Sequence, residues 1–264
     1  MLPVSPELLG ILLPALVAGL MIAFTHVPLG IEVLRRGIIF IDLAIAQIAG
    51  LGLVVMALYW PDAAGWMLQT VAVACALAAA LLFHWSESRL PAQQEALIGS
   101  SFVLAASLAL LLLADEPHGG EAIQHLLSGQ LLFVGWSDLA LAAPLYALVL
   151  LAWFVWPRVR AGMGFYVLFA LAVTASVQLA GVYVVFASLI LPALAAAAWP
   201  GWALFIAWAS AGAAVLAGLT AALLFDWPAG PVLVVSYALV ALAAVLPRWR
   251  RTIPDAVDRK PDDL

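Results

Sequence analysis

Residues 35–59 read RRGIIFIDLAIAQIAGLGLVVMALY, an apolar run that opens on two arginines. From Gly37 to Tyr59 the residues are apolar or small, apart from Asp42 and Gln47. A helix needs about 20 predominantly apolar residues to cross a bilayer. The stretch therefore predicts a membrane-spanning helix that begins just after a basic pair and carries one carboxylate within it.

The carboxylate of Asp42 needs an explanation, because a bare charge inside a span costs about 2.5–3.5 kcal/mol on insertion scales. Such residues usually face a cavity, a partner or a transported ion, which is the first interpretation of Asp42. The alternative is structural. Asp42 follows Gly37 by only about 8 Å along a helix, so it can lie shallow enough to pair with Arg35 or Arg36.

Composition extends this interpretation to the whole chain. Of the 264 residues, 67% are hydrophobic and 9% are charged, whereas soluble domains are about 45–50% apolar. The single cysteine, Cys75, lies in an apolar run, which excludes a disulfide framework and a CxxC metal motif. We therefore expect a polytopic membrane protein, and we expect no nucleic-acid partner.

The expected fold is an all-α integral membrane protein with about eight or nine spans. It forms a single membrane domain over residues 1–264, of which 248–264 is a tail. A shorter apolar run at 126–136 cannot cross as a helix and predicts a half-helix or re-entrant segment. The candidate spans are 8–28, 37–59, 65–84, 96–114, 139–156, 163–180, 182–198, 203–225 and 230–247.

The basic residues predict the orientation. Cytoplasmic loops carry an excess of Lys and Arg, and with nine spans all ten such residues fall on one side. The N-terminus is then outside and the C-terminal tail is cytoplasmic. This arrangement requires that the run 163–198 be split at Gly181, where no polar loop marks a boundary.

No nucleotide-binding motif is present in the sequence: it has neither GxxxxGK[ST] nor a GxGxxG after a strand pattern. The loops on the basic side are too short to hold an ATPase. If ATP drives a process here, another chain must hydrolyse it, and we do not expect this chain to be an enzyme.

Four stretches together resemble the membrane permease of the metal-ion ABC importers, the zinc/manganese type whose fold is related to the vitamin B12 and siderophore permeases. The first is a basic pair followed by an Asp-bearing helix, and the third is a Gly-initiated helix that closes on Leu-Ile-x-Pro-Ala. In chain order the stretches are Val33–Gly52, His125–Leu139, Gly181–Ala193 and Asp226–Pro231.

The resemblance implies a permease in the bacterial inner membrane that translocates a divalent metal ion, zinc or manganese, as its substrate and binds no cofactor of its own. It also implies a homodimer with the pathway between two copies, a cytoplasmic ATPase subunit and a periplasmic metal-binding protein. The competing class is a secondary carrier or channel, in which Asp42 is a protonatable site and no ATPase docks.

The sequence departs from this family at the metal-binding helix. The family pattern is Asp-x-x-x-His, which places a carboxylate and an imidazole on one helix face, but the residue four after Asp42 is Ala46. The next polar residue is Gln47, which is about 140° round the helix from Asp42 and could join it only through a π-bulge or a ligand from another helix. We take Asp42 and Gln47 as candidate metal ligands, whose oxygen donors suit a harder ion such as manganese. Alternatively, Gln47 hydrogen-bonds a neighbouring helix.

The second departure concerns the ATPase contact. In the related permeases, short and normally basic cytoplasmic helices follow the Leu-Ile-x-Pro-Ala run, whereas residues 193–202 here carry no charge. Either this segment docks through apolar side chains or it is an interfacial aromatic pair at a tight turn. The candidate ATPase contacts are Pro192, Trp199, Pro200, Gly201 and Trp202.

The histidines fall into two groups. His118 and His125 share the predicted outer loop with Glu121, and these residue types are metal ligands. They are candidate ligands there, unless the loop is acidic only because outer loops exclude Lys and Arg. His26 and His84 lie near the predicted cytoplasmic ends of spans, where we expect solvated or interfacial side chains.

Overall fold

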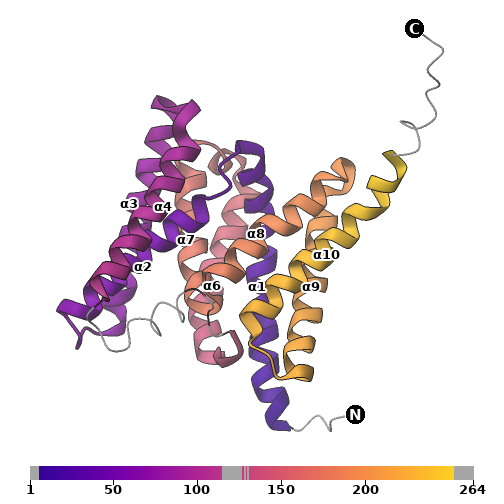
Figure 1. The fold of residues 1–264 in the computed structure, drawn as a ribbon, viewed down its shortest axis with the longest axis horizontal. Helices are drawn as coiled ribbons and strands as arrows, with labels where there is room; N and C mark the ends of the chain where they lie inside the picture. The colour runs from indigo at the N-terminus through magenta and orange to yellow at the C-terminus, as the bar shows by residue number, and fades with distance from the viewer. Residues whose placement is uncertain (1–5, 115–126, 128, 130, 253–264) are drawn as a thin grey trace.

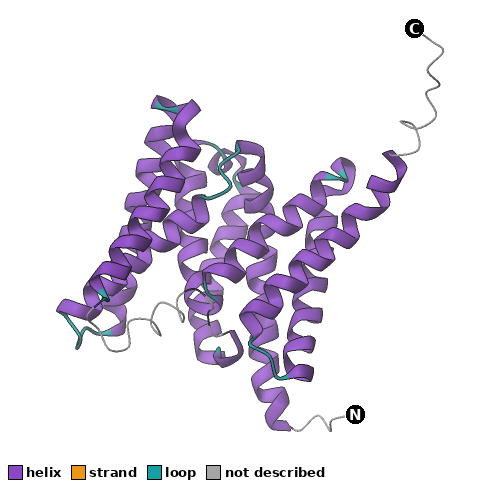
Figure 2. Ribbon diagram, in the orientation of Figure 1, coloured by secondary structure: helices purple, strands orange, loops and turns teal. Residues whose placement is uncertain are grey.

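The computed structural model describes residues 6–114, 127, 129 and 131–252, and this part of the chain folds into α-helices joined by short turns (Figures 1 and 2). The α-helices are α1 (Pro6–Arg36), α2 (Ile41–Tyr59), α3 (Gly65–Arg89), α4 (Gln94–Leu112), α6 (Trp136–Val155), α7 (Gly162–Ala180), α8 (Val182–Ala197), α9 (Ala203–Phe225) and α10 (Ala229–Thr252). Four single turns of 3-10 helix are η1 (Pro91–Gln93), η2 (Leu131–Phe133), η3 (Pro157–Arg160) and η4 (Pro200–Trp202).

The predicted all-α polytopic fold is confirmed. Among the described residues, eight helices are long and apolar enough to cross a membrane, and α8 is a shorter apolar helix. At about 1.5 Å per residue, the 16 residues of α8 extend less far than the roughly 30 Å hydrocarbon core of a bilayer.

One predicted boundary is wrong. The first helix does not end at residue 28: α1 runs on through Pro28 and Gly30 to Arg36, because apolar residues continue on the helix beyond Pro28. Gly37 has a φ of +72°, a value that favours glycine and ends the helix. At the other end of the chain, the last membrane span is Ala229–Pro247, close to the predicted 230–247, and α10 continues beyond it to Thr252.

The split at Gly181 is confirmed. Gly181 has a φ of +80° and separates α7 from α8 without a polar loop. Gly129, also in a left-handed conformation, lies against the backbone at Ala180 and Gly181, where a Cβ atom would collide with main-chain atoms. Two glycines are therefore required where the backbones meet.

The helices form two sides with a central group between them. In Figure 1, α2, α3 and α4 lie on one side, α9 and α10 lie on the other, and α1, α6, α7 and α8 lie between them. One hydrophobic core includes Ile45, Phe83 and Phe169, and the other includes Ala18, Val215 and Leu233. The cavity described below is lined by helices of both sides and of the central group.

The described part of the short run 126–136 is not a transmembrane helix. It contains the 3-10 turn η2, whose Leu131 is buried against the second hydrophobic core. Its re-entrant character stays a prediction.

Candidate translocation site

A cavity of about 890 Å³ lies between α2, α4, α8 and α10. The face of α2 that lines it is formed by Leu43, Gln47, Gly50, Leu53, Val54 and Ala57. These positions follow the spacing of three and four residues that places side chains on one side of a helix. One face of the predicted metal-binding helix therefore lines a cavity large enough for a small substrate.

The lining is almost entirely apolar. Only Gln47 and Tyr183 among the described lining residues carry a polar side-chain group. Gln47 is 5% exposed, and its amide has no hydrogen-bond partner among the described residues. No described residue of a neighbouring helix therefore bonds Gln47, and the amide is available to a ligand in the cavity.

Asp42 and Gln47 do not form one site. Asp42 is 2% exposed and is absent from the cavity lining. It shares the buried face of α2 with Ile45, Ala46 and Ala49, which pack into the protein core. The pair at positions i and i+4 that faces the cavity is Leu43 and Gln47, so the carboxylate lies behind the cavity wall.

The Asp42 carboxylate is unusually isolated. Among the described residues, neither of its buried oxygens has a hydrogen-bond partner. Asp42 lies in the first turn of α2, where the helix dipole favours a negative charge.

Glu95 was not singled out by its sequence, because an acidic residue at the start of a helix is ordinary. In the structure it accepts a hydrogen bond from the backbone N–H of Phe40, at 3.2 Å from nitrogen to oxygen. Its second oxygen is buried without a partner in the described part of the chain. Two carboxylates therefore lie near the beginning of α2, and only the three-dimensional fold brings them together.

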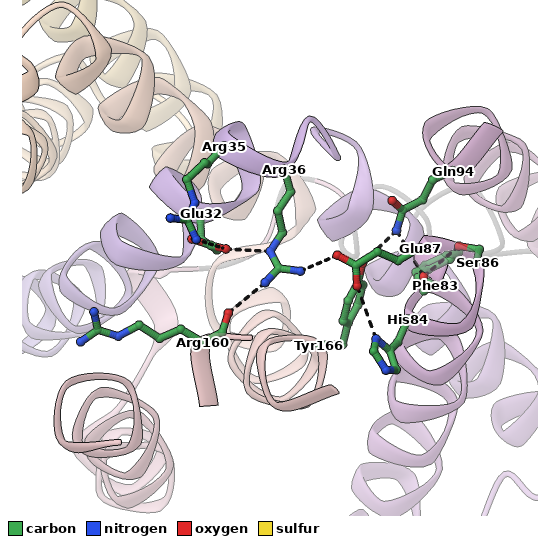
Figure 3. Close-up of polar contacts among 10 residues, drawn as sticks. All are labelled: Glu32, Arg35, Arg36, Phe83, His84, Ser86, Glu87, Gln94, Arg160 and Tyr166. Atoms are coloured by element: carbon green, nitrogen blue, oxygen red, sulfur yellow. Dashed lines mark hydrogen bonds and ion pairs between the residues drawn. The ribbon is translucent and has the colours of Figure 1, made fainter. Parts of the chain in front are cut away.

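The structural alternative for Asp42, an ion pair with Arg35 or Arg36, is wrong. Both arginines bind Glu32 instead, at nitrogen–oxygen distances of 2.6 Å for Arg35 and 2.8 Å for Arg36 (Figure 3). Glu32 lies three and four residues before them on α1, the spacing that brings side chains together on a helix. The carboxylate that both arginines share is therefore on the preceding turn.

Arg36 is the centre of a polar cluster that joins the ends of several helices (Figure 3). It also donates to Glu87 at 2.7 Å and to the carbonyl oxygen of Arg160 at 2.9 Å. Its guanidinium lies 4.3 Å from the centre of the Phe165 ring, a cation–π contact. The cluster fixes the end of α1 against α3 and α7.

The predicted ATPase contacts differ in their exposure. Pro192 is buried within α8 and offers no surface to a partner, because this apolar helix packs against its neighbours on that side. The indole of Trp199 donates to the carbonyl oxygen of Ala244 in α10 at 3.0 Å. Pro200, Gly201 and Trp202 are exposed, so the available surface is the turn η4 alone.

The histidine predictions have different outcomes. His118, Glu121 and His125 lie outside the described residues. Within the part of the chain that the structure describes, no group of three or more His, Cys, Asp or Glu side chains could hold a metal ion.

The expectation that His26 is interfacial is wrong, since its side chain is fully buried among hydrogen-bonding partners. His84 is partly exposed and lies 3.5 Å from Glu87.

The family model of the ABC 3 transport family matches residues 9–160 and 157–248, which together cover most of the chain. The chain belongs to this family. The predicted resemblance to the metal ABC transporter permeases is thereby confirmed, and a role as a transport permease is favoured over a self-sufficient carrier or channel. No protein with a curated description matches.

A solved structure shows the same fold. The chain is similar to "PsaBC from Streptococcus pneumoniae in complex with Fab", with 19% sequence identity and a TM-score of 0.73. The similarity covers 93% of this chain and 95% of that one. The overall arrangement of the helices is thus one that a solved structure already shows.

Proposed function

We propose that this permease imports a divalent metal ion and that the ion passes along the cavity face of α2. The observation that carries the proposal is the position of Gln47, the one polar side chain of α2 that lines the cavity, with its amide unpaired among the described residues. An unpaired amide in an apolar wall is costly unless a ligand or water meets it. Gln47 would therefore meet the ion.

The donor types favour a hard ion. The amide oxygen of Gln47 and the hydroxyl of Tyr183 are oxygen donors, and oxygen ligands suit manganese better than zinc, which imidazole and thiolate bind well. Asp42 would not contact the ion, since it lies behind the cavity wall. We therefore propose manganese as the preferred substrate.

A second copy of the chain would complete the pathway. The cavity wall includes side chains that are half exposed, such as Tyr183 at 49%, Leu110 at 55% and Val235 at 57%. A cation cannot cross a membrane along a groove that faces lipid on one side, because the ion would lose its polar surroundings. We propose a homodimer in which two such grooves face each other.

A separate ATPase would supply the energy from the cytoplasmic side, and a periplasmic metal-binding protein would deliver the ion. The one-sided placement of Lys and Arg supports a cytoplasmic C-terminus. The exposed turn η4 is the proposed contact for the ATPase. Its Trp202 is 68% exposed and packs edge-on against Phe205, which is typical of a side chain that inserts into a partner's apolar pocket.

The test is metal uptake into vesicles that contain the permease and its ATPase. Gln47→Leu keeps a side chain of similar size but removes the oxygen donor, and we expect it to lower manganese uptake at least about tenfold. Ser101→Ala is the matched control, because the Ser101 hydroxyl donates only to the Leu97 carbonyl of its own helix. Normal uptake by Gln47→Leu would refute the proposed pathway.

A further inference from the structure

Four side chains from four helices form a buried chain of hydrogen bonds around His26 of α1. The Nδ1 atom of His26 lies 2.7 Å from the Ser188 hydroxyl of α8, and Nε2 lies 2.9 Å from the Ser176 hydroxyl of α7. The Tyr146 hydroxyl of α6 lies 2.7 Å from Ser176. These four residues are at most 2% exposed.

The imidazole donates to one serine and accepts from the other. The hydroxyls of both serines also lie within hydrogen-bond reach of a carbonyl on their own helix, Ser188 of Val185 at 2.8 Å and Ser176 of Ala172 at 2.7 Å. The described residues place no carboxylate in an ion pair with His26, and an unpaired buried charge is costly. The imidazole is therefore neutral, with one ring nitrogen as a donor and the other as an acceptor.

The Tyr146 hydroxyl extends this network through Ser176 to a fourth helix. Both ring nitrogens of His26 have a hydrogen-bond partner only when α1, α7 and α8 keep this arrangement. Buried networks of this kind are costly to break.

A second contact lies one helical turn further along α1. Gly30 faces the backbone of Leu189, and a Cβ atom at Gly30 would lie 2.8 Å from the Leu189 carbonyl carbon. The main chains of α1 and α8 thus meet directly beside the His26–Ser188 bond. Together these contacts form one joint between the two helices.

The joint lies between the cavity and the proposed ATPase contact. The first turns of α8 carry the lining residues Val182, Tyr183 and Phe186, and the turn η4 follows its last turn. We propose that His26 is a positioning residue that makes α1 and α8 move as one body, so that motion at η4 reaches the cavity wall. This rests on the proposed function, in which an ATPase binds η4.

The test measures the amount of metal moved per ATP hydrolysed by the reconstituted complex. Ser188→Ala removes the α8 hydrogen-bond partner of His26, and we expect this ratio to fall about tenfold, the factor for one lost buried hydrogen bond. Ser188→Thr keeps the hydroxyl and should retain the ratio. Ser210→Ala is the control, because Ser210 likewise donates to a carbonyl three residues earlier, at 2.9 Å, but has no partner on another helix.

Nitrogen-15 magnetic resonance of labelled histidine gives a second readout. We expect the His26 signals of the wild-type protein to report a neutral imidazole, and we expect Ser188→Ala to change them while Ser210→Ala does not. Unchanged His26 signals in Ser188→Ala, or a normal transport ratio in that variant, would overturn the proposed joint. A wild-type complex that moves no metal while hydrolysing ATP would instead refute the proposed function, and the coupling role of His26 with it.

Discussion

Replacing Gly30 with alanine tests the packing of α1 against α8. Gly30 lies in the interior of α1, where glycine is normally less stable than alanine. Here an added Cβ would press against the carbonyl oxygen of Leu189 and lie 2.8 Å from its carbonyl carbon. These are backbone atoms of a packed helix, which cannot rotate away, so α1 and α8 would have to separate.

The expected cost follows from two opposing terms. Overpacking in a well-packed interior costs about 1–3 kcal/mol, and we place Gly30→Ala near the upper value because the obstacle is main chain. The gain in helix propensity offsets about 1 kcal/mol. The free energy of unfolding should therefore fall by about 2 kcal/mol.

Gly99→Ala in α4 is the matched control, because nothing lies within 4 Å of an added Cβ there. It should gain about 1 kcal/mol from helix propensity alone. Unfolding of each purified variant in detergent, followed by tryptophan fluorescence, measures the difference. If Gly30→Ala is as stable as Gly99→Ala, the close approach of α1 and α8 is wrong.

Three further predictions concern the ends of the helices. Arg36→Gln should lower the free energy of unfolding by about 1–3 kcal/mol, because it leaves Glu87 and Glu32 without their shared partner. Arg35→Gln should change that free energy little, since the Arg35 side chain is 73% exposed. Equal effects of the two variants would contradict the role of Arg36. A reporter fused after Leu264 should be active only in the cytoplasm, and periplasmic activity would overturn the orientation. A cysteine at Gly201 should cross-link to a co-expressed ATPase, and its failure to do so in an intact complex would remove η4 as the contact.

Much of the fold could be predicted from the sequence, because the bilayer imposes a length and an apolar composition on each span. The break at Gly181 shows the strength of this reasoning, since orientation alone required a turn where no polar residue marked one. The continuation of α1 through Pro28 shows its limit. A proline inside a helix predicts a boundary or a kink only when neighbouring helices do not support the freed backbone.

The functional site was harder to predict, since it depends on which face of α2 points where. A charge in a span draws attention to Asp42, yet the neighbouring position Leu43 lines the cavity and Asp42 does not. A difference of one residue turns a side chain by about 100° around a helix, and an almost uniformly apolar helix offers no pattern from which to read that angle. Gln47 was found for its polarity, and only the fold shows that its amide reaches the cavity.

His26 shows a second limit of the same kind. Its partners Ser188 and Ser176 are 162 and 150 residues away in sequence, and serines in transmembrane helices are common. No local signal distinguishes a histidine at the membrane interface from one that joins four helices.

Cysteine accessibility along α2 tests the central claim, that its cavity face lines the pathway, most directly. In a Cys75→Ser background within the assembled complex, we expect a water-soluble thiol reagent to modify Gln47→Cys and Val54→Cys, and manganese to slow that reaction. Ile45→Cys and Ala49→Cys should stay unmodified, because they face the protein core. Modification of the core-facing positions with none on the cavity face would contradict the account.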